Sequence, residues 1–251
     1  MKRPKLSINI NKIALIRNSR GGQLPDLLHM AMDLETYGAE GITVHPRPDQ
    51  RHIRYTDIPI LKKYISTELN IEGYPTPEFI HLVLDNNPAQ VTLVPDPPGA
   101  LTSDHGWDIQ SHHSFLEPII AEFKSQGIRV SLFVDAIPMN ASLAKSVGAD
   151  RIELYTGPYA EQFKSDALSA VTPHINTAVR AESEGIDINA GHDLNLDNLA
   201  WYTLSLPQLD EVSIGHAMIC DALYYGYSNV VAMYLDRLVN PTHYEEYTNN
   251  I

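Results

Sequence analysis

Short runs of β-branched and other apolar residues recur along the chain, and a longer amphipathic stretch follows each of them. Eight of these runs have the length of a strand, and they begin at Leu6, Gly41, Leu69, Val91, Arg129, Arg151, Ile186 and Glu211. Apolar strands that alternate with amphipathic helices are typical of a parallel sheet covered on both faces. The pattern therefore predicts eight β/α units.

Glycine phrases at the predicted helix ends support this arrangement. Four strands begin within the phrases YGAEGITV, SQGIRVSL, VGADRIEL and SEGIDINA, shortly after a glycine that follows a predicted helix. Glycine just past a helix supplies the left-handed residue that ends it, and the next apolar run begins the strand. The predicted helices include residues 24–37, 76–87, 114–125, 166–184 and 222–238. In the helix over 166–184, Pro173 is expected to bend or interrupt the helix because proline lacks an amide donor.

Eight parallel units can close into a (β/α)8 barrel or form an open doubly wound sheet. An open sheet usually carries a glycine-rich dinucleotide loop after its first strand. Here the first strand ends in NINKIALIRNSRGG, which lacks the G-x-G-x-x-G spacing. The length of 251 residues also suits a barrel, which typically has roughly 250. We therefore predict a single α/β domain over residues 1–251, folded as a (β/α)8 TIM barrel.

The chain carries 31 acidic and 18 basic residues, a formal net charge of −13. Its surface as a whole should repel nucleic acid and anionic membranes, so any phosphate site must be local. No apolar stretch approaches the ~20 residues that span a bilayer, and MKRPKLSINI lacks the apolar region of a signal peptide. The only cysteine, Cys220, excludes an intrachain disulfide and a cysteine-rich zinc site. We expect a cytoplasmic protein that binds neither nucleic acid nor membranes.

Polar residues stand where the predicted strands end. In β/α barrels the active site lies at the carboxyl ends of the strands. The residues at these ends are Asn9, Asn11, Lys12, His45, Arg47, His52, Glu72, Glu153, His192, Gly215 and His216. Their positions predict that they converge on one mouth of the barrel.

Two kinds of sequence near these ends suit phosphate. The segment ITVHPRPDQRHIRY holds three arginines and two histidines within ten residues. Arginine donates two parallel hydrogen bonds to phosphate oxygens. NAGHDLN and SIGHAMI place a Gly-His pair at strands seven and eight, where backbone amides form the usual phosphate cradle of this fold. The ordinary alternatives are a solvated basic loop and hydrogen-bonded loop histidines.

Glu72 and the segment after the fourth strand are candidates for a catalytic role. Glu72 ends the strand LNIE, so its carboxylate should face the barrel mouth, where burial raises its pKa and suits it to acid or base chemistry. The alternative is a salt bridge to a neighbouring arginine. Residues of about 95–113 form a long connection rich in proline and glycine. It is either a lid that closes over substrate or a variable surface loop.

Six motifs in register along the chain carry a family resemblance: NINKIALIRNSRGG, GITVHPRPDQRHI, LNIEG, SLFVDA, NAGHDLN and IGHA. Together they resemble the pyridoxine 5′-phosphate synthase family. The resemblance implies a (β/α)8 barrel that condenses 1-deoxy-D-xylulose 5-phosphate with 3-amino-2-oxopropyl phosphate. The products are pyridoxine 5′-phosphate, inorganic phosphate and water, in the ring-closing step of vitamin B6 synthesis. It further implies a cytoplasmic transferase without metal or organic cofactor that assembles from dimers into a homo-octamer.

The resemblance also implies roles for single residues. His45 and Glu72 match the family's general bases, and His192 matches its general acid. The residues that match its contacts to deoxyxylulose phosphate are Arg20, Arg47, His52 and Thr102. Those that match its site for the aminoketone phosphate are Asn9, Gly215 and His216.

The chain departs from the family pattern at two places. Many members have Asp-His where this chain has Asn11-Lys12, which keeps a polar contact and changes its charge. Asp193 stands where a glycine usually follows the catalytic histidine. Its backbone amide can still bind phosphate, but a carboxylate that pointed inward would repel it. We therefore expect the Asp193 side chain to turn away and to cap a helix that starts near Leu196.

Three other functions remain as alternatives. One is a Schiff-base aldolase in which buried Lys12 is the amine nucleophile. Another is a metal-dependent hydrolase that uses His45, His192, His216 and a carboxylate as ligands, although the first strand lacks the usual H-x-H pair. The last is a catalytically inactive binding protein that has kept its phosphate sites.

Overall fold

Eight parallel strands form the centre of the molecule. The computed structural model describes residues 3–96 and 103–247. Within these residues the strands pair in chain order, and the last strand pairs with the first, so that the sheet closes into a barrel. The strands are β1 (Lys5–Asn9), β2 (Gly41–Val44), β3 (Glu68–Gly73), β4 (Gln90–Leu93), β5 (Arg129–Val134), β6 (Arg151–Tyr155), β7 (Asp187–His192) and β8 (Leu209–Ile214). The predicted (β/α)8 TIM barrel is confirmed.

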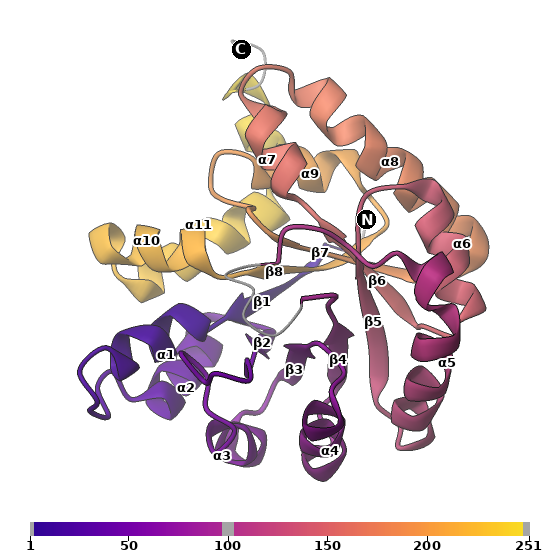
Figure 1. Cartoon of the computed structure of the whole chain (residues 1–251). Helices are drawn as coiled ribbons and strands as arrows, with labels where there is room; N and C mark the ends of the chain where they lie inside the picture. The colour runs from indigo at the N-terminus through magenta and orange to yellow at the C-terminus, as the bar shows by residue number, and fades with distance from the viewer. Residues whose placement is uncertain (1–2, 97–102, 248–251) are drawn as a thin grey trace.

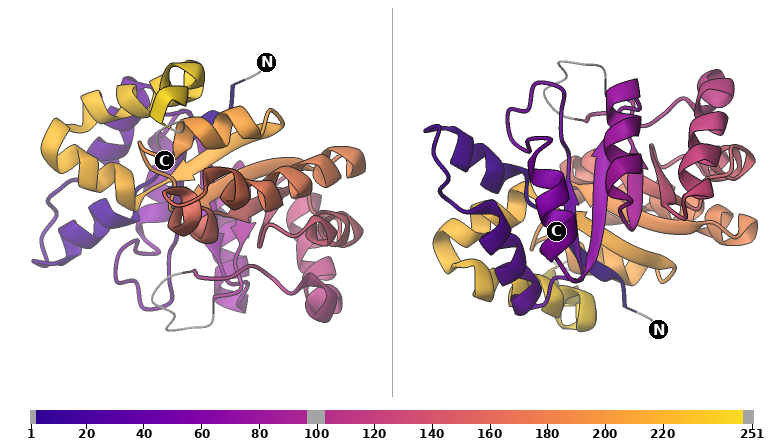
Figure 2. Two further views of the ribbon diagram at one scale, coloured as in Figure 1. Left: turned by 90° about the horizontal axis from the view of Figure 1, so that it is seen from above. Right: turned by 90° about the horizontal axis from the view of Figure 1, so that it is seen from below.

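Helices form an outer layer around the strands (Figure 1), which the two turned views in Figure 2 also show. They are α1 (Asn11–Asn18), α2 (Leu27–Tyr37), α3 (Asp57–Tyr64), α4 (Pro77–Asn86), α5 (Ile109–Ser125), α6 (Pro138–Ser146), α7 (Gly157–Phe163), α8 (Ala167–Glu184), α9 (Leu199–Ser205), α10 (His216–Tyr225) and α11 (Tyr227–Val239), followed by the 3-10 helix η1 (Pro241–Tyr247). No helix in the described part of the chain is long and apolar enough to cross a membrane.

The predicted joints between helices and strands are confirmed, and two details of the helices differ. Gly38, Gly127, Gly148 and Gly185 all have a positive φ between a helix and the next strand. The prediction that Pro173 could interrupt its helix was wrong, because α8 continues through it. The buried face of α8 packs against its neighbours, which offsets the loss of one backbone hydrogen bond. The helix predicted over 222–238 is divided at Gly226, whose φ is +77°.

Residues on the strands alternate between two environments. Outward residues such as Leu6, Ile8 and Ile71 are fully buried and belong to the apolar core beneath the helices. The interior is polar instead. Ser7 Oγ lies 2.8 Å from Thr43 Oγ1, and Thr92 Oγ1 donates to Asn70 Oδ1 across 3.1 Å. The inward positions therefore carry hydrogen-bonding groups along the barrel axis, where a TIM barrel more commonly packs branched apolar side chains.

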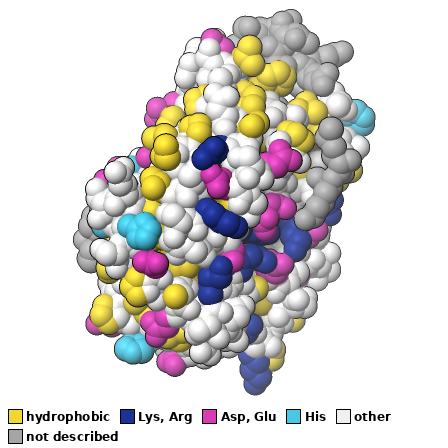
Figure 3. Space-filling view, turned by 90° about the vertical axis from the view of Figure 1, so that its right-hand side faces the viewer, with side chains coloured by type: hydrophobic (Ala, Val, Ile, Leu, Met, Phe, Trp, Pro, Cys, Tyr) yellow, Lys and Arg dark blue, Asp and Glu magenta, His cyan; other side chains and the backbone are white. Residues whose placement is uncertain are grey.

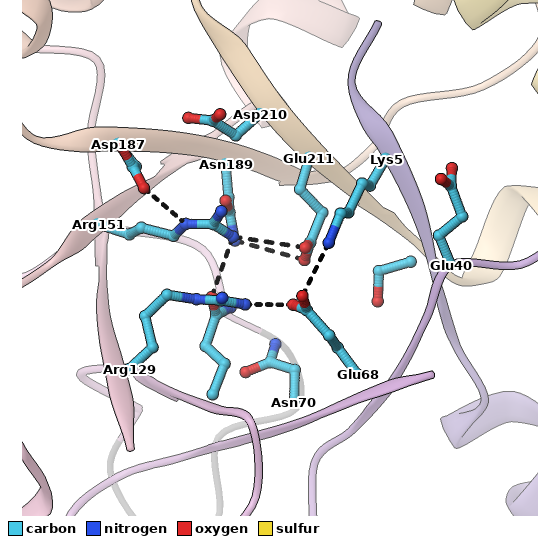
Figure 4. A network of polar contacts seen from close by, with 12 residues as sticks. Lys5, Glu40, Glu68, Asn70, Arg129, Arg151, Asp187, Asn189, Asp210 and Glu211 are labelled. Carbon is cyan, nitrogen blue, oxygen red and sulfur yellow. Dashed lines mark hydrogen bonds and ion pairs between the residues drawn. The ribbon is translucent and has the colours of Figure 1, made fainter. Parts of the chain in front are cut away.

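A network of charged side chains occupies the amino end of the barrel (Figure 4). Glu68 accepts hydrogen bonds from Lys5 Nζ, at 2.8 Å, and from Arg129. Arg151 donates to Glu211 and lies 3.5 Å from Asp187. These residues stand at or near the first positions of their strands, so the network lies at the opposite end of the barrel from the carboxyl ends of the strands.

Candidate active site

A cavity of about 280 Å³ opens at the carboxyl ends of the strands. It brings together most of the site residues that the sequence predicts: Asn9, Asn11, Lys12, His45, Arg47, His52, Glu72, His192, Asp193, Gly215 and His216. Glu153, which the sequence also places at a strand end, lines the cavity too, and so do Ser103 and Ser213, which the sequence did not indicate. Side chains from β1, β2, β3, β6, β7 and β8 and the loops after them therefore meet in one space, as the barrel topology predicts.

Arg20 and Thr102 are the two other residues that the sequence assigns to substrate binding. Arg20 lies in the turn after α1, where it is exposed and does not line the cavity. Thr102 and the rest of 97–102 lie outside the described residues, so the lid predicted for about 95–113 is described only in part.

His45 and Glu72 form the buried centre of the cavity. His45 Nδ1 lies 3.9 Å from Glu72 Oε2, and both side chains are more than nine-tenths buried. Burial lowers the pKa of His45 well below its ordinary value, and the positive charge of Arg47 lowers it further. Burial also raises the pKa of Glu72, and the charge of Glu153 adds to this rise. The pair therefore holds a neutral imidazole beside a carboxyl that exchanges its proton at a higher pH than usual.

Asn9 and Asn11 position this pair. Asn9 Nδ2 donates to Glu72 Oε2 at 3.4 Å, while its Oδ1 accepts from the Asn11 amide at 3.0 Å. Asn11 Oδ1 in turn accepts from the backbone amide of His45 at 2.9 Å. The two asparagines at the end of β1 thus connect both predicted bases, a role that the sequence did not indicate.

Arg47 and His52 form the basic side of the cavity. Arg47 Nη2 donates to Asp96 Oδ2 at 2.6 Å, and Ser103 Oγ donates to the same oxygen at 2.5 Å. His52 is 7% exposed, and its Nδ1 has no hydrogen-bond partner among the described residues. Burial and the charge of Arg47 lower the pKa of His52 to about 4. A buried imidazole nitrogen without a partner, beside a guanidinium, suits the binding of an anion's oxygens.

His192 ends β7 in a backbone conformation that is rare for its residue type. Its φ is +91°. Its ring centroid lies 4.8 Å from that of Phe133 and 5.8 Å from that of Tyr155. Burial lowers the pKa of His192, whereas the carboxylate of Asp193 raises it. The imidazole is therefore a group that gives up its proton readily.

The loop after β8 brings a helix terminus to the cavity. Gly215 precedes α10, whose first residue is His216. A Cβ atom on Gly215 would lie 3.0 Å from Asn9 Cβ, so the glycine permits the close approach of β8 to β1. The first amides of α10 have no side-chain cap, which leaves them available to bind an anion.

The capping role predicted for Asp193 was wrong. Helix α9 begins at Leu199, and its N-cap residue Asn198 makes no side-chain cap bond. The side chain of Asn195 stabilises the turn before α9 instead, because its Oδ1 accepts hydrogen bonds from the amides of Asp197 and Asn198. Asp193 is exposed and lines the cavity.

Two acidic residues gain importance from the structure. Glu153 is 1% exposed, and burial together with the charge of Glu211 raises its pKa to about 8. Asp96, which pairs with Arg47, directly follows the apolar run of β4 and Pro95. The signal that identified the other site residues, a polar residue after an apolar strand, would also have found Asp96.

The cavity offers acid and base groups rather than a metal cage. The described residues contain no group of three or more histidine, cysteine or acidic side chains that could hold a metal ion. Lys12 lines the cavity, as the aldolase alternative requires.

Comparison with known proteins identifies the family. Residues 6–240 match the family model of the pyridoxal phosphate biosynthesis protein PdxJ. The chain belongs to this family. A PdxJ relative, the pyridoxine 5′-phosphate synthase of Cytophaga hutchinsonii, is 58% identical over 234 residues, which cover 93% of this chain and 98% of that protein. The synthase of Parabacteroides distasonis is 54% identical over 229 residues, 91% of this chain and 96% of that protein.

Solved structures with little sequence identity share the fold. A 3-keto-L-gulonate-6-phosphate decarboxylase from Vibrio cholerae aligns with a TM-score of 0.65 at 9% identity, over 95% of this chain and 98% of that one. This likeness concerns the barrel alone. The PdxJ family match favours the synthase over the Schiff-base aldolase.

Proposed function

We propose that the chain is a pyridoxine 5′-phosphate synthase. It condenses 1-deoxy-D-xylulose 5-phosphate with 3-amino-2-oxopropyl phosphate and releases pyridoxine 5′-phosphate, phosphate and water. The observation that carries the proposal is one cavity lined by His45, Glu72 and His192 together with two groups suited to phosphate. Membership of the PdxJ family and the names of its relatives support it.

The reaction consists largely of proton transfers, which the cavity can supply. Amine attack on a ketone, loss of water, enolisation, elimination of phosphate and ring closure each move a proton. His45 is kept neutral by burial, so its imidazole can accept a proton. Glu72, whose pKa burial raises, can take up a proton and return it. His192, whose pKa burial lowers, is a ready proton donor once it is charged.

The two substrates each carry a phosphate, and the cavity has two places for one. Arg47 and His52, with Lys12 close enough for its charge to act on His52, suit the phosphate of the deoxyxylulose. Gly215, His216 and the first amides of α10 suit the phosphate of the aminoketone, which the product keeps.

The proposal extends to the working form of the enzyme. We propose that it acts in the cytoplasm without metal or organic cofactor, as a homo-octamer built from dimers. Sedimentation of the purified protein would test the octamer. Arg20, which lies outside the cavity of the single chain, would then contribute to a site only through a rearrangement or a neighbouring subunit.

The deciding experiment is to mix the purified protein with both substrates and to follow the product by absorbance and mass. Glu72→Gln is the matched control, because it keeps the shape of the side chain and removes its proton transfer. We expect turnover to be lost while substrate affinity stays within about tenfold, roughly 1.4 kcal/mol. Wild-type turnover in the variant would refute the role of Glu72. The absence of product from folded wild-type protein would refute the proposed function.

A further inference from the structure

The backbone of His192 is strained. A φ of +91° is unfavourable for any residue with a Cβ atom, and it persists only where the surroundings enforce it. His192 stands between Gly191 and Asp193, and the carbonyl groups of both neighbours accept hydrogen bonds from buried groups. The first carbonyl belongs to the peptide that leads into His192 and the second to the peptide one residue beyond it, so the two hydrogen bonds fix the chain before and after His192.

On the first side, Thr156 holds the carbonyl of Gly191. Thr156 follows β6 and is completely buried. Its Oγ1 donates to the Gly191 carbonyl oxygen at 2.6 Å, and its backbone amide donates to the same oxygen at 3.2 Å. Gly191 also has no room to shift toward the barrel axis, since a Cβ atom there would lie 2.5 Å from Glu153 Oε1.

On the second side, Asn198 holds the carbonyl of Asp193. Asn198 is 1% exposed, and its Nδ2 donates to that oxygen at 3.2 Å, beside the exposed Nδ2 of Asn195 at 3.3 Å. Its Oδ1 accepts a hydrogen bond from the Asn195 amide at 2.8 Å, which connects two residues of the same loop. Its own carbonyl accepts from the hydroxyl of Tyr159 at 2.7 Å, so the loop is attached to α7.

We propose that Thr156 and Asn198 are positioning residues, which hold the strained backbone of His192 so that its imidazole faces the substrate. The inference rests on the proposed function, in which His192 is the proton donor. The imidazole packs against the rings of Phe133 and Tyr155, which also contact each other with centroids 5.5 Å apart, so a small rotation of the chain at His192 would move the imidazole relative to both rings. Neither positioning residue lines the cavity, and each acts through a backbone carbonyl.

The test compares two substitutions of Thr156. Thr156→Val removes the hydroxyl and keeps the shape, whereas Thr156→Ser keeps the hydroxyl. Thr177→Val is the matched control, because Thr177 is also completely buried and donates to the Pro173 carbonyl in α8. We expect Thr156→Val to lower kcat about tenfold, since a small misplacement of an acid slows proton transfer. The KM for each substrate should stay within about twofold, and Thr156→Ser and Thr177→Val should behave like the wild type.

A second measurement follows His192 itself. Its imidazole ¹⁵N signals, assigned by their loss in His192→Gln, are titrated with pH in each variant. The charges that act on this ring come from Asp193, Asp96 and Arg47. We expect Thr156→Val to change the shifts and the titration midpoint of His192, because the ring moves relative to these charges. Asn198→Asp, which keeps the oxygen and loses the donating amide, should produce a similar change.

The outcomes separate this inference from the proposed function. The inference is overturned if Thr156→Val matches Thr177→Val in both kcat and the His192 titration, or if Thr156→Ser loses as much activity as Thr156→Val. If the wild type forms no product, the proposed function fails. The titration needs no product, so a changed His192 titration in Thr156→Val would still support the positioning contacts, and an unchanged one would overturn them.

Discussion

The guanidinium of Arg47 lies against the carboxylate of Asp96 and also lines the cavity. Arginine can serve both partners because its planar fork presents several donors at once, whereas the lysine ammonium is a single point of charge. We therefore predict that Arg47→Lys raises the KM for one phosphorylated substrate by about tenfold or more. Saturation kinetics with each substrate in turn would measure the change. Arg54→Lys, in the same segment but outside the cavity, should leave both KM values unchanged.

Glu153 gives the barrel a stability that depends on pH. Its pKa rises from an ordinary 4.5 to about 8 in the folded protein. Between pH 4.5 and about 8 the folded state keeps a proton that the unfolded state has released. The contribution of Glu153 to the free energy of unfolding is therefore complete below pH 4.5 and is lost as the pH rises through about 8. Glu153→Gln does not titrate. We predict that this variant gains a few kcal/mol relative to wild type between about pH 5 and 9, measured by urea unfolding. A difference that does not vary with pH would contradict the shifted pKa.

The elements of the fold were largely predictable from local sequence, and the contacts between them were not. Apolar runs and helix-ending glycines located all eight strands, because both features act within a few neighbouring residues. Polar residues at strand ends located the cavity, because barrel closure brings these ends together. The sequence did not indicate that Asn11 binds the His45 amide or that His192 has a positive φ. Each depends on the register of different strands.

The connection from β4 to α5 shows how an element fixes part of the site. A Cβ atom on Gly106 would lie 2.2 Å from the backbone nitrogen of Asp135, so the connection passes directly over the end of β5. The next residue, Trp107, donates from Nε1 to the Leu93 carbonyl. Gly106 therefore fixes the path of this connection, which also brings Ser103 within hydrogen-bonding distance of Asp96.

We predict that Gly106→Ala destabilises the protein by about 2 kcal/mol, because the added methyl group must displace backbone rather than a flexible side chain. The KM of the substrate bound by Arg47 should rise with it, as Ser103 and Asp96 shift. Thermal unfolding and saturation kinetics would measure the two effects. Gly22→Ala, whose methyl group would come no closer than 4.0 Å to the backbone nitrogen of Leu24, should change neither. Equal behaviour of the two variants would show that the close approach is unimportant.

At the scale of the whole molecule, the groups suited to catalysis lie at one end of the barrel and a charged network that stabilises the fold lies at the other. The carboxyl end holds the cavity, and the amino end holds the network around Arg151 and Glu68 (Figure 4). The outer surface also pairs its charges. On the face that carries α5 and α6, basic side chains lie beside acidic ones (Figure 3), and Lys124 Nζ lies 2.8 Å from Asp150 Oδ1. Exposed pairs of this kind contribute little to stability, whereas the buried pair of Arg151 and Glu211 cannot lose one partner without leaving the other charge buried.

Arg151 provides the test of this separation. It is 7% exposed and donates to Glu211 and Gln90, so its removal leaves the buried Glu211 without the cation that it pairs with. We predict that Arg151→Gln lowers the free energy of unfolding by about 3 kcal/mol, measured by urea unfolding, while turnover well below the melting temperature is unchanged. Burial already raises the pKa of Glu211, and Arg151 opposes this rise. In the variant Glu211 should therefore hold its proton to a higher pH, and the loss of stability should grow as the pH increases.

The matched control is Arg180→Gln, because Arg180 forms an exposed pair with Glu184 at 2.7 Å. Its loss should cost no more than about 0.5 kcal/mol, since solvent screens the pair. If Arg151→Gln were as stable as Arg180→Gln, the network would be no more than a solvated charge cluster. If it lost turnover at temperatures where it remains folded, the amino end of the barrel would take part in the chemistry, and the separation of the two ends would be wrong. We expect Arg151→Gln to lose stability and to retain turnover, because Arg151 lies at the end of the barrel opposite the cavity.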